Sequence, residues 1–169
     1  MRPAIILTAL LVLTACNRDK TTTVTTAEGK EVKITAGGDN SSESGTITFE
    51  GKDGEGGKIT YGADAVKAGL PLGLPVYPGG EVKGAFMGGD KGGNGGMVTV
   101  LTSDPPAKVI DFYKSEAAKR GFEIQSRATA SNSIASFTAQ AKDKSSLVVT
   151  ATPGEGGKTA VMIIGGNKN

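Results

Sequence analysis

The chain contains no histidine, no tryptophan and a single cysteine. Histidine supplies the general base of Ser-His-Asp triads and is a common ligand of zinc. Its absence therefore excludes such triads, histidine acid–base catalysis and most zinc sites. The single cysteine, Cys16, has no partner in the chain with which to form a disulfide.

The first sixteen residues, MRPAIILTALLVLTAC, carry one charge, that of Arg2. An apolar block at residues 5–13 follows it, and small residues come next. A membrane-spanning helix needs roughly 20 apolar residues, so this block is too short to be a permanent anchor. A positive start, a short apolar core and a small-residue end are typical of a secretory signal peptide.

The end of this segment, Leu13-Thr14-Ala15-Cys16, resembles the lipobox of bacterial lipoproteins. That resemblance implies that residues 1–15 are a signal peptide removed by cleavage, and that the sulfur of Cys16 carries a diacylglyceryl group. Two or three acyl chains anchor a protein stably, whereas one chain holds it only reversibly. An acylated Cys16 leaves no thiol for a disulfide, for thiol catalysis or for a metal site.

The residue after the cysteine is Asn17 and not aspartate. In Gram-negative lipoproteins an aspartate at this position favours retention at the inner membrane. The same resemblance therefore implies an exported protein anchored by its acyl chains at the periplasmic face of the outer membrane, if the host is Gram-negative.

The charges are almost balanced, with 19 Lys and Arg against 17 Asp and Glu. This balance leaves no basic surface for nucleic acid. The segment GEGGKT at residues 154–159 ends like a phosphate-binding loop, but Thr152 stands where the pattern needs glycine, and a strand is expected to follow instead of a helix. We therefore expect no nucleic acid, no nucleotide, no cofactor and no metal among the ligands.

Three segments are expected in the mature chain. Residues 16–45 are polar and contain few large apolar side chains, which predicts a lipidated flexible tether with one weak strand at 31–35. Residues 46–80 predict a small hairpin followed by the Pro/Gly-rich lead-in GLPLGLPVYPGG. Residues 81–169 predict the main domain.

In the main domain, apolar alternation predicts strands, and residues 88–96 predict a glycine loop. The expected strands are 81–87, 97–102, 122–127, 134–141, 147–152 and 159–164. A helix at about 106–120 separates the second and third of these. Short turns pair neighbouring strands antiparallel. The sequence therefore predicts an α+β fold, in which a mostly antiparallel sheet of about six strands carries one helix on one face, in the order β-β-α-β-β-β-β. Because residues 161–164 are apolar on both faces, the last strand is expected to be central.

The helix has a start signal, a stop signal and one apolar face. Ser103 or Asp104 is expected as its N-cap, with proline at the first helical position, and Gly121 ends it. Charged pairs three and four residues apart are expected on its surface. The stripe expected to face the core comprises Val109, Ile110, Tyr113 and Ala117.

The segments PVYPGGEV and SDPPAKVIDFYKSEAAKRGFEI resemble a module of uncharacterised exported bacterial proteins, with a Pro-x-Tyr-Pro-Gly element and a helix carrying Phe-Tyr. The resemblance covers about residues 75–165 and implies no catalytic residues. Tyr77, in the Pro-Tyr-Pro segment, is the one candidate for an exposed binding aromatic, and its alternative is packing over the sheet edge.

These observations predict a membrane-anchored lipoprotein of the cell envelope that is not an enzyme and acts as a binding or structural module. Two alternatives stay open at this point. One is a carboxylate-based hydrolase or carbohydrate-active envelope protein, which would need two carboxyl groups facing each other in a cleft. The other is an accessory subunit of an envelope complex with an unknown protein partner.

Overall fold

The computed structural model describes residues 20–25, 31–37, 44–51, 55–90, 93–130 and 134–168. Its first half contains β1 Lys20–Thr25, β2 Glu31–Gly37, β3 Gly45–Gly51, β4 Gly56–Tyr61, α1 Ala63–Ala68 and η1 Pro71–Gly73. Its second half contains β5 Glu81–Asp90, β6 Gly93–Thr102, α2 Pro106–Lys119, β7 Glu123–Ala130, β8 Ile134–Gln140, β9 Ser146–Pro153, η3 Glu155–Gly157 and β10 Thr159–Lys168. None of the helices in these ranges is long and apolar enough to cross a membrane.

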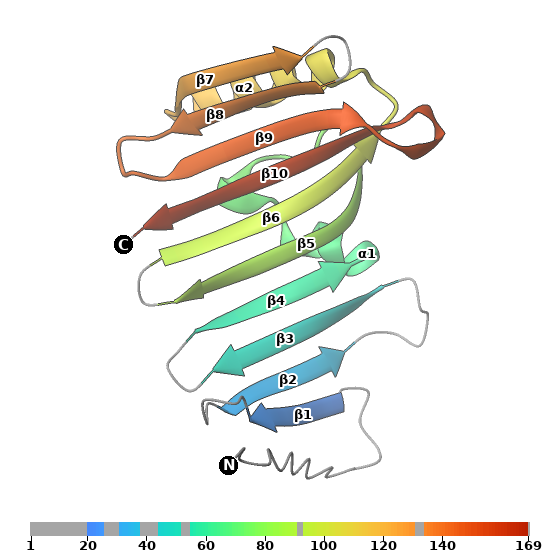
Figure 1. Cartoon of the computed structure of the whole chain (residues 1–169), viewed down its shortest axis with the longest axis vertical. Helices are drawn as coiled ribbons and strands as arrows, with labels where there is room; N and C mark the ends of the chain where they lie inside the picture. The colour runs from blue at the N-terminus through green and yellow to red at the C-terminus, as the bar shows by residue number, and fades with distance from the viewer. Residues whose placement is uncertain are drawn as a thin grey trace, which may run out of the picture.

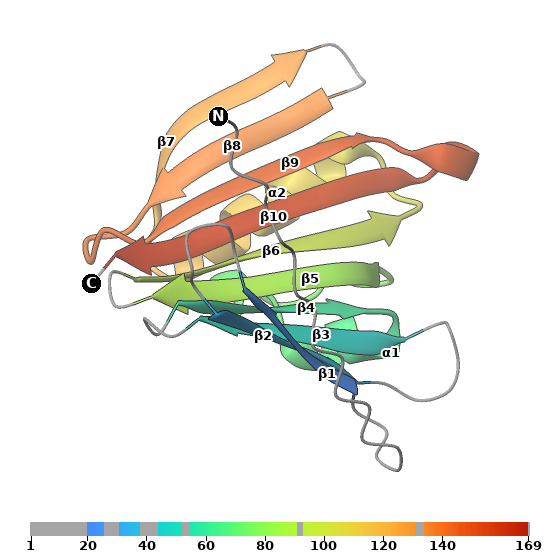
Figure 2. The same cartoon turned by 60° about the horizontal axis from the view of Figure 1, so that its bottom comes forward.

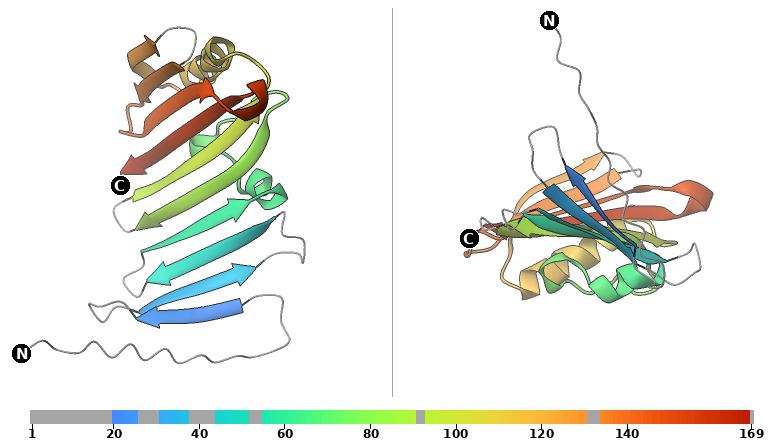
Figure 3. Two further views of the ribbon diagram at one scale, coloured as in Figure 1. Left: turned by 45° about the vertical axis from the view of Figure 1, so that its right-hand side comes forward. Right: turned by 90° about the horizontal axis from the view of Figure 1, so that it is seen from below.

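All ten strands form one antiparallel sheet in the order β1-β2-β3-β4-β5-β6-β10-β9-β8-β7. Figure 1 looks onto the face that carries no helix, with both helices behind the sheet. Figure 3 shows α1 and α2 together on one side. We call this side the helix face and the other side the open face. The strand direction rotates from β1 to β7 (Figure 2), which is the ordinary twist of a sheet.

The predicted fold class is wrong in the size of the sheet and in the number of helices. The sheet has ten strands instead of about six, because the expected hairpin does not stand apart: β4 pairs with β5 from Gly56 to Tyr61 and joins the two parts. The additional helix, for which the sequence carries no clear signal, is α1. It is only six residues long and lies between Gly62 and Gly69, both at positive φ, so it has too little length for a helical pattern.

Two strands occupy part of the expected tether. β1 and β2 pair with each other from Lys20 to Ala36, and β2 adds to the edge of β3. β-Branched residues are abundant in both strands, mostly threonine in β1 and valine, isoleucine and threonine in β2, and they favour extended backbone. The paired edge of β3 supplies the hydrogen bonds that an isolated segment of this composition would lack.

The expected glycine loop at residues 88–96 is also wrong. β5 runs to Asp90, and β6 begins at Gly93, so the glycines continue two paired strands. β10 is likewise four residues longer than expected. It is an interior strand between β6 and β9, which agrees with its apolar residues on both faces.

The core lies between the helix face and α2. The predicted stripe of α2 is confirmed, since all four of its residues are buried. The helix ends before Gly121, which has φ 78°, as expected. Its start differs: Pro105 is the N-cap and no side chain caps the helix. Asp104 instead accepts hydrogen bonds from Tyr77 and Lys108.

Candidate functional site

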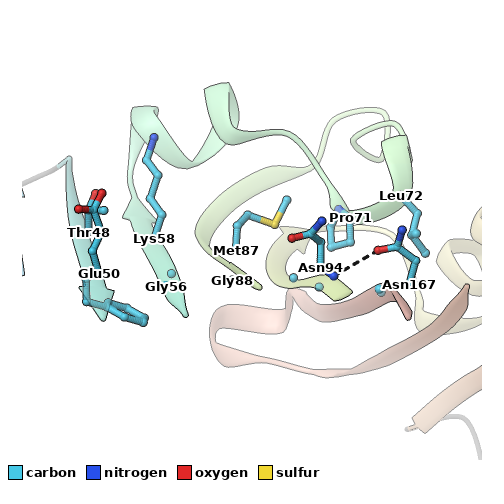
Figure 4. A pocket seen from close by; sticks show the side chains of 16 residues that line it. Thr48, Glu50, Gly56, Lys58, Pro71, Leu72, Met87, Gly88, Asn94 and Asn167 are labelled. Atoms are coloured by element: carbon cyan, nitrogen blue, oxygen red, sulfur yellow. Dashed lines mark hydrogen bonds between the residues drawn. The ribbon is translucent and has the colours of Figure 1, made fainter. Parts of the chain in front are cut away.

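A groove of about 560 Å³ crosses the helix face at the glycine-rich ends of the strands. Its floor consists of β3, β4, β5, β6 and β10, and η1 forms one wall. Figure 4 shows Lys58 and Met87 rising from the floor, with Pro71 and Leu72 at one end and Thr48 and Glu50 at the other. We call this the helix-face groove.

Glycines on the helix face make room for the groove. A Cβ at Gly165 would lie 2.7 Å from Cδ1 of Leu72, so only glycine lets η1 settle onto β10. A Cβ at Gly96 would lie 2.1 Å from Sδ of Met87, whose side chain rests across β6. Met87 is flexible and half-buried, so it is the element of the floor that a ligand can displace most easily.

The groove carries Lys58 toward β3, and it carries apolar side chains together with Asn94 and Asn167 toward η1 (Figure 4). Lys58 pairs across the strands with Thr48 and with Met87, so these three side chains share a row on the helix face. The backbone N–H of Asn94 donates a hydrogen bond of 3.3 Å to Oδ1 of Asn167. A cation and amide groups therefore stand beside a surface of Met87, Leu72 and Pro71.

The groove suits binding better than acid–base chemistry. Its lining includes one carboxylate, that of Glu50. The carboxyl groups with a displaced pKa, Glu81, Asp104, Glu116 and Asp143, do not line it. Hydrogen bonds from Lys83 and from Lys119 lower the pKa of Glu81 and of Glu116, respectively. A carboxyl group with a lowered pKa stays ionised near neutral pH and does not act as a general acid. Within the described ranges, no cluster of three or more His, Cys, Asp or Glu could hold a metal ion.

Tyr77 is not an exposed aromatic. It is 5% exposed and packs edge-on against Phe112, with ring centroids 5.1 Å apart. Its hydroxyl donates a 2.7 Å hydrogen bond to Asp104, and its backbone N–H donates one of 3.1 Å to the hydroxyl of Tyr113. Burial raises the pKa of Tyr77 to about 12, and the hydrogen bond to Asp104 adds to this effect. Tyr77 is therefore a packing residue, as its alternative expected, but its partner is α2 and not the sheet edge.

Cys16 and Asn17 lie outside the described residues, so lipidation stays a prediction.

The helix-face groove was missed because none of its polar residues forms a recognised motif. The available signal was glycine within three strands, at Gly96 and Gly165 on the helix face and at Gly88, Gly95 and Gly166 on the other. Glycine in a strand often marks the close approach of another group, but the same residues favoured a loop.

Residues 82–159 match the model of a family described as START domain-like. The match runs from β5 to the beginning of β10, includes α2, and covers less than half of the chain. It indicates a ligand-binding module. Met87 and Asn94 lie within the matched residues, whereas Lys58, Leu72 and Asn167 lie outside them. No curated protein and no solved structure matches the chain.

Proposed function

We propose that this chain is a lipid-anchored, non-enzymatic protein of the cell envelope that binds a small amphipathic ligand in the helix-face groove. The observation that carries the proposal is that Lys58 stands beside an apolar surface formed by Met87, Pro71 and Leu72. A ligand with an apolar body and an anionic end would match both. The START domain-like match supports a binding role.

The anchor is Cys16, placed by the lipobox-like segment in front of it. Lys20, the first residue of β1, is the fourth residue after Cys16, and an extended chain over that separation spans at most about 14 Å. Acyl chains on Cys16 would therefore hold the β1 edge of the sheet close to the bilayer. With Asn17 next to the anchor, the periplasmic face of the outer membrane is the proposed location in a Gram-negative host.

Nothing in the described part of the chain favours the hydrolase alternative. Cleavage of a glycosidic bond needs two carboxyl groups that flank the bond, and the groove offers Glu50 without a second one. The accessory-subunit alternative depends on a partner, which purification of the anchored protein from membranes in detergent would reveal.

Titration with anilinonaphthalene sulfonate, a fluorescent probe with an apolar body and an anionic end, tests the binding site. The variant Lys58→Gln removes the cation of the groove and should weaken binding by up to about fivefold, since exposed charge pairs contribute up to about 1 kcal/mol. Lys33→Gln is the matched control, because it removes an equal charge from the same face one strand beyond the lining. Equal weakening in both variants would show that the probe responds to overall charge and not to the groove.

The anchor has a separate test. The intact mass of protein extracted from membranes should correspond to a chain that begins at Cys16 and carries two or three acyl groups. The variant Cys16→Ser should remain as precursor or be released from the membrane. A soluble, unmodified mature chain would disprove the anchor and leave the groove proposal untouched.

A further inference from the structure

An apolar ridge crosses six neighbouring strands on the open face. Its members are cross-strand partners, each paired in register with the next: Ile47, Ile59, Phe86, Met97, Ile164 and Val148. The row runs from β3 to β9 and spans about 24 Å. Residues on alternate positions, such as Val98 and Ile163, point to the helix face and are fully buried, which places the ridge on the opposite side.

The ridge faces solvent in the described structure. Ile59 is 40% exposed, Met97 39% and Ile164 42%. No described side chain in the ridge, or in the open-face row on either side of it, carries a charge. Contiguous exposed apolar surface of this kind marks interaction sites.

A row of small residues lies beside the ridge, and on each strand its member is two residues away from the ridge residue. It contains Gly57, Gly88, Gly95 and Gly166, which are also direct cross-strand partners. The rings of Phe49 and Phe86 lie over the first two, since a Cβ at Gly57 would be 2.5 Å from Cζ of Phe49, and one at Gly88 would be 2.9 Å from Cζ of Phe86. A Cβ at Gly95 would meet only backbone atoms, 3.5 Å or more away, whereas one at Gly166 would lie 2.8 Å from the carbonyl oxygen of Asn94, so the hollow lies above Gly95 of β6.

Ridge and hollow are complementary to each other under a two-fold rotation. An axis parallel to the ridge, between it and the glycine row, would place Met97 and Ile164 of one copy over Gly95 and Gly166 of the other. Two sheets would then pack face to face with aligned strands, which is the ordinary arrangement of a β-sandwich. We propose that the open face is the interface of a homodimer and that its occupant is a second copy of this chain.

The available area is sufficient for a stable dimer. The seven strands from β2 to β9 and about seven residues of each span roughly 34 Å by 23 Å, on the order of 800 Å² on each copy. One partner in a standard interface buries about the same area. The absence of charge from the centre of the face means that two identical copies can meet without burying like charges.

The protein mass of the full-length, lipidated chain in detergent tests the proposal, measured by light scattering with the detergent contribution subtracted. The unaltered chain should contain two copies per particle. Ile164→Lys would bury an unpaired charge and should weaken the dimer by at least about a hundredfold. Gly95→Leu would fill the hollow without adding charge. It should also leave single copies, and circular dichroism should show that both variants remain folded.

Val66→Lys is the matched control. Val66 is 52% exposed on α1, so the same kind of substitution at comparable exposure is made away from the open face. This variant should remain dimeric. The proposal is overturned if the unaltered chain is monomeric, if either Ile164→Lys or Gly95→Leu leaves the dimer intact, or if Val66→Lys dissociates it. If two copies shared one micelle only through their anchors, the particle would still contain two copies after Ile164→Lys, and this result would also overturn the proposal.

A lipid surface is the competing occupant of the open face. Because the chain has no tryptophan, Met97→Trp would place a single reporter on the ridge. In vesicles of brominated phosphatidylcholine, its emission should match that in vesicles without bromine, because the second copy covers it. Contact quenching by the brominated lipid would show that the bilayer covers this face, and would overturn the proposal.

Discussion

Strands β5 to β10 and strands β1 to β4 belong to one sheet but differ in where their apolar side chains lie. From β5 onward, buried residues such as Val98, Val161 and Val149 fill the helix face beneath η1 and α2. In the first four strands the large apolar residues lie on the open face, as Ile34, Phe49 and Ile59 do.

The helix face of the first four strands is mostly polar. Thr48, Lys58 and Thr35 occupy it, and α1 covers only a part around Thr60, which is 1% exposed. Because apolar burial supplies most of the stability of a fold, the second half has a core of its own and the first half does not. The stability of the first half therefore depends on its pairing with β5 and on whatever covers the open face.

Hydrogen exchange should show the largest difference between the two halves. Amides of β6 and β10 should exchange only by global unfolding, at about 5–15 kcal/mol, whereas those of β1 and β2 should open at a small fraction of this free energy. β1 is the outermost strand and pairs with β2, where the hydroxyl groups of Thr21 and Thr35 lie 3.2 Å apart. Hydrogen exchange followed by mass spectrometry measures these opening free energies. Equal protection of β6 and β10 and of β1 and β2 would contradict the expected difference between the two halves.

The core beneath α2 should be the most sensitive to truncation. Tyr113 is fully buried, and its hydroxyl accepts the N–H of Tyr77. Tyr113→Ala should lower the free energy of unfolding by about 3–5 kcal/mol. Lys114→Ala, next to it on the helix, loses only a 3.2 Å ion pair with Asp111 and should cost less than about 0.5 kcal/mol. Urea unfolding gives both values, and similar losses would mean that the helix face is assigned wrongly.

One substitution made on both faces sharpens the comparison further. Ile163 is fully buried on the helix face, and Ile59 is 40% exposed on the open face. In dilute protein, Ile163→Ala should cost about 2–5 kcal/mol, and Ile59→Ala less than about 1 kcal/mol. The urea midpoint should therefore shift several times more for the first variant. A larger shift for Ile59→Ala would place the main core on the open face.

Acid should act through Asp104, near the start of α2. The hydrogen bond from Tyr77, and then the one from Lys108, lower the pKa of Asp104 below its ordinary value of 3.8. Because the folded pKa lies below the unfolded one, this stabilisation is present above about pH 4 and is lost as the pH falls through the folded value. Urea midpoints between about pH 6 and about pH 3 should fall less steeply in Asp104→Asn than in the unaltered chain. If the urea midpoints of the two proteins fell equally with pH, Asp104 would not have this stabilising role.

Part of the fold follows from local sequence patterns, and part does not. The 3.6-residue period of α2, the proline at its start and Gly121 after it are local, and so are the ion pairs Asp111–Lys114 and Glu116–Arg120, both found. The number of strands is not local. The polar segment that contains β1 and β2 looks unable to fold alone, and its pairing depends on the edge that β3 offers.

The candidate site was beyond prediction for a similar reason. Its residues come from β3, β4, η1, β5, β6 and β10, and only the strand order brings Lys58 and Asn167 into one groove. The glycines at 88, 95, 96, 165 and 166 were visible, but a glycine run fits a loop as well as a strand that makes room for a neighbour. Tyr77 was selected because it stands between prolines, a context that does not reveal the ring of Phe112 against it.

The central claim is that the two faces of the sheet have different tasks, with a ligand on the helix face and a second copy on the open face. Because tryptophan is absent from the natural chain, one reporter can be placed on each face. Met87→Trp stands in the helix-face groove and Met97→Trp on the ridge. Dibromostearate is the probe, since it has an apolar body and an anionic end, and its bromine atoms quench tryptophan only at contact.

Tryptophan emission during titration with dibromostearate tests this claim most directly, with unbrominated stearate as the control. We predict saturable quenching of Met87→Trp, weakened by adding Lys58→Gln, and no quenching of Met97→Trp at the same concentrations. Saturable quenching of Met97→Trp with none of Met87→Trp would contradict the account, because it would place the ligand on the open face.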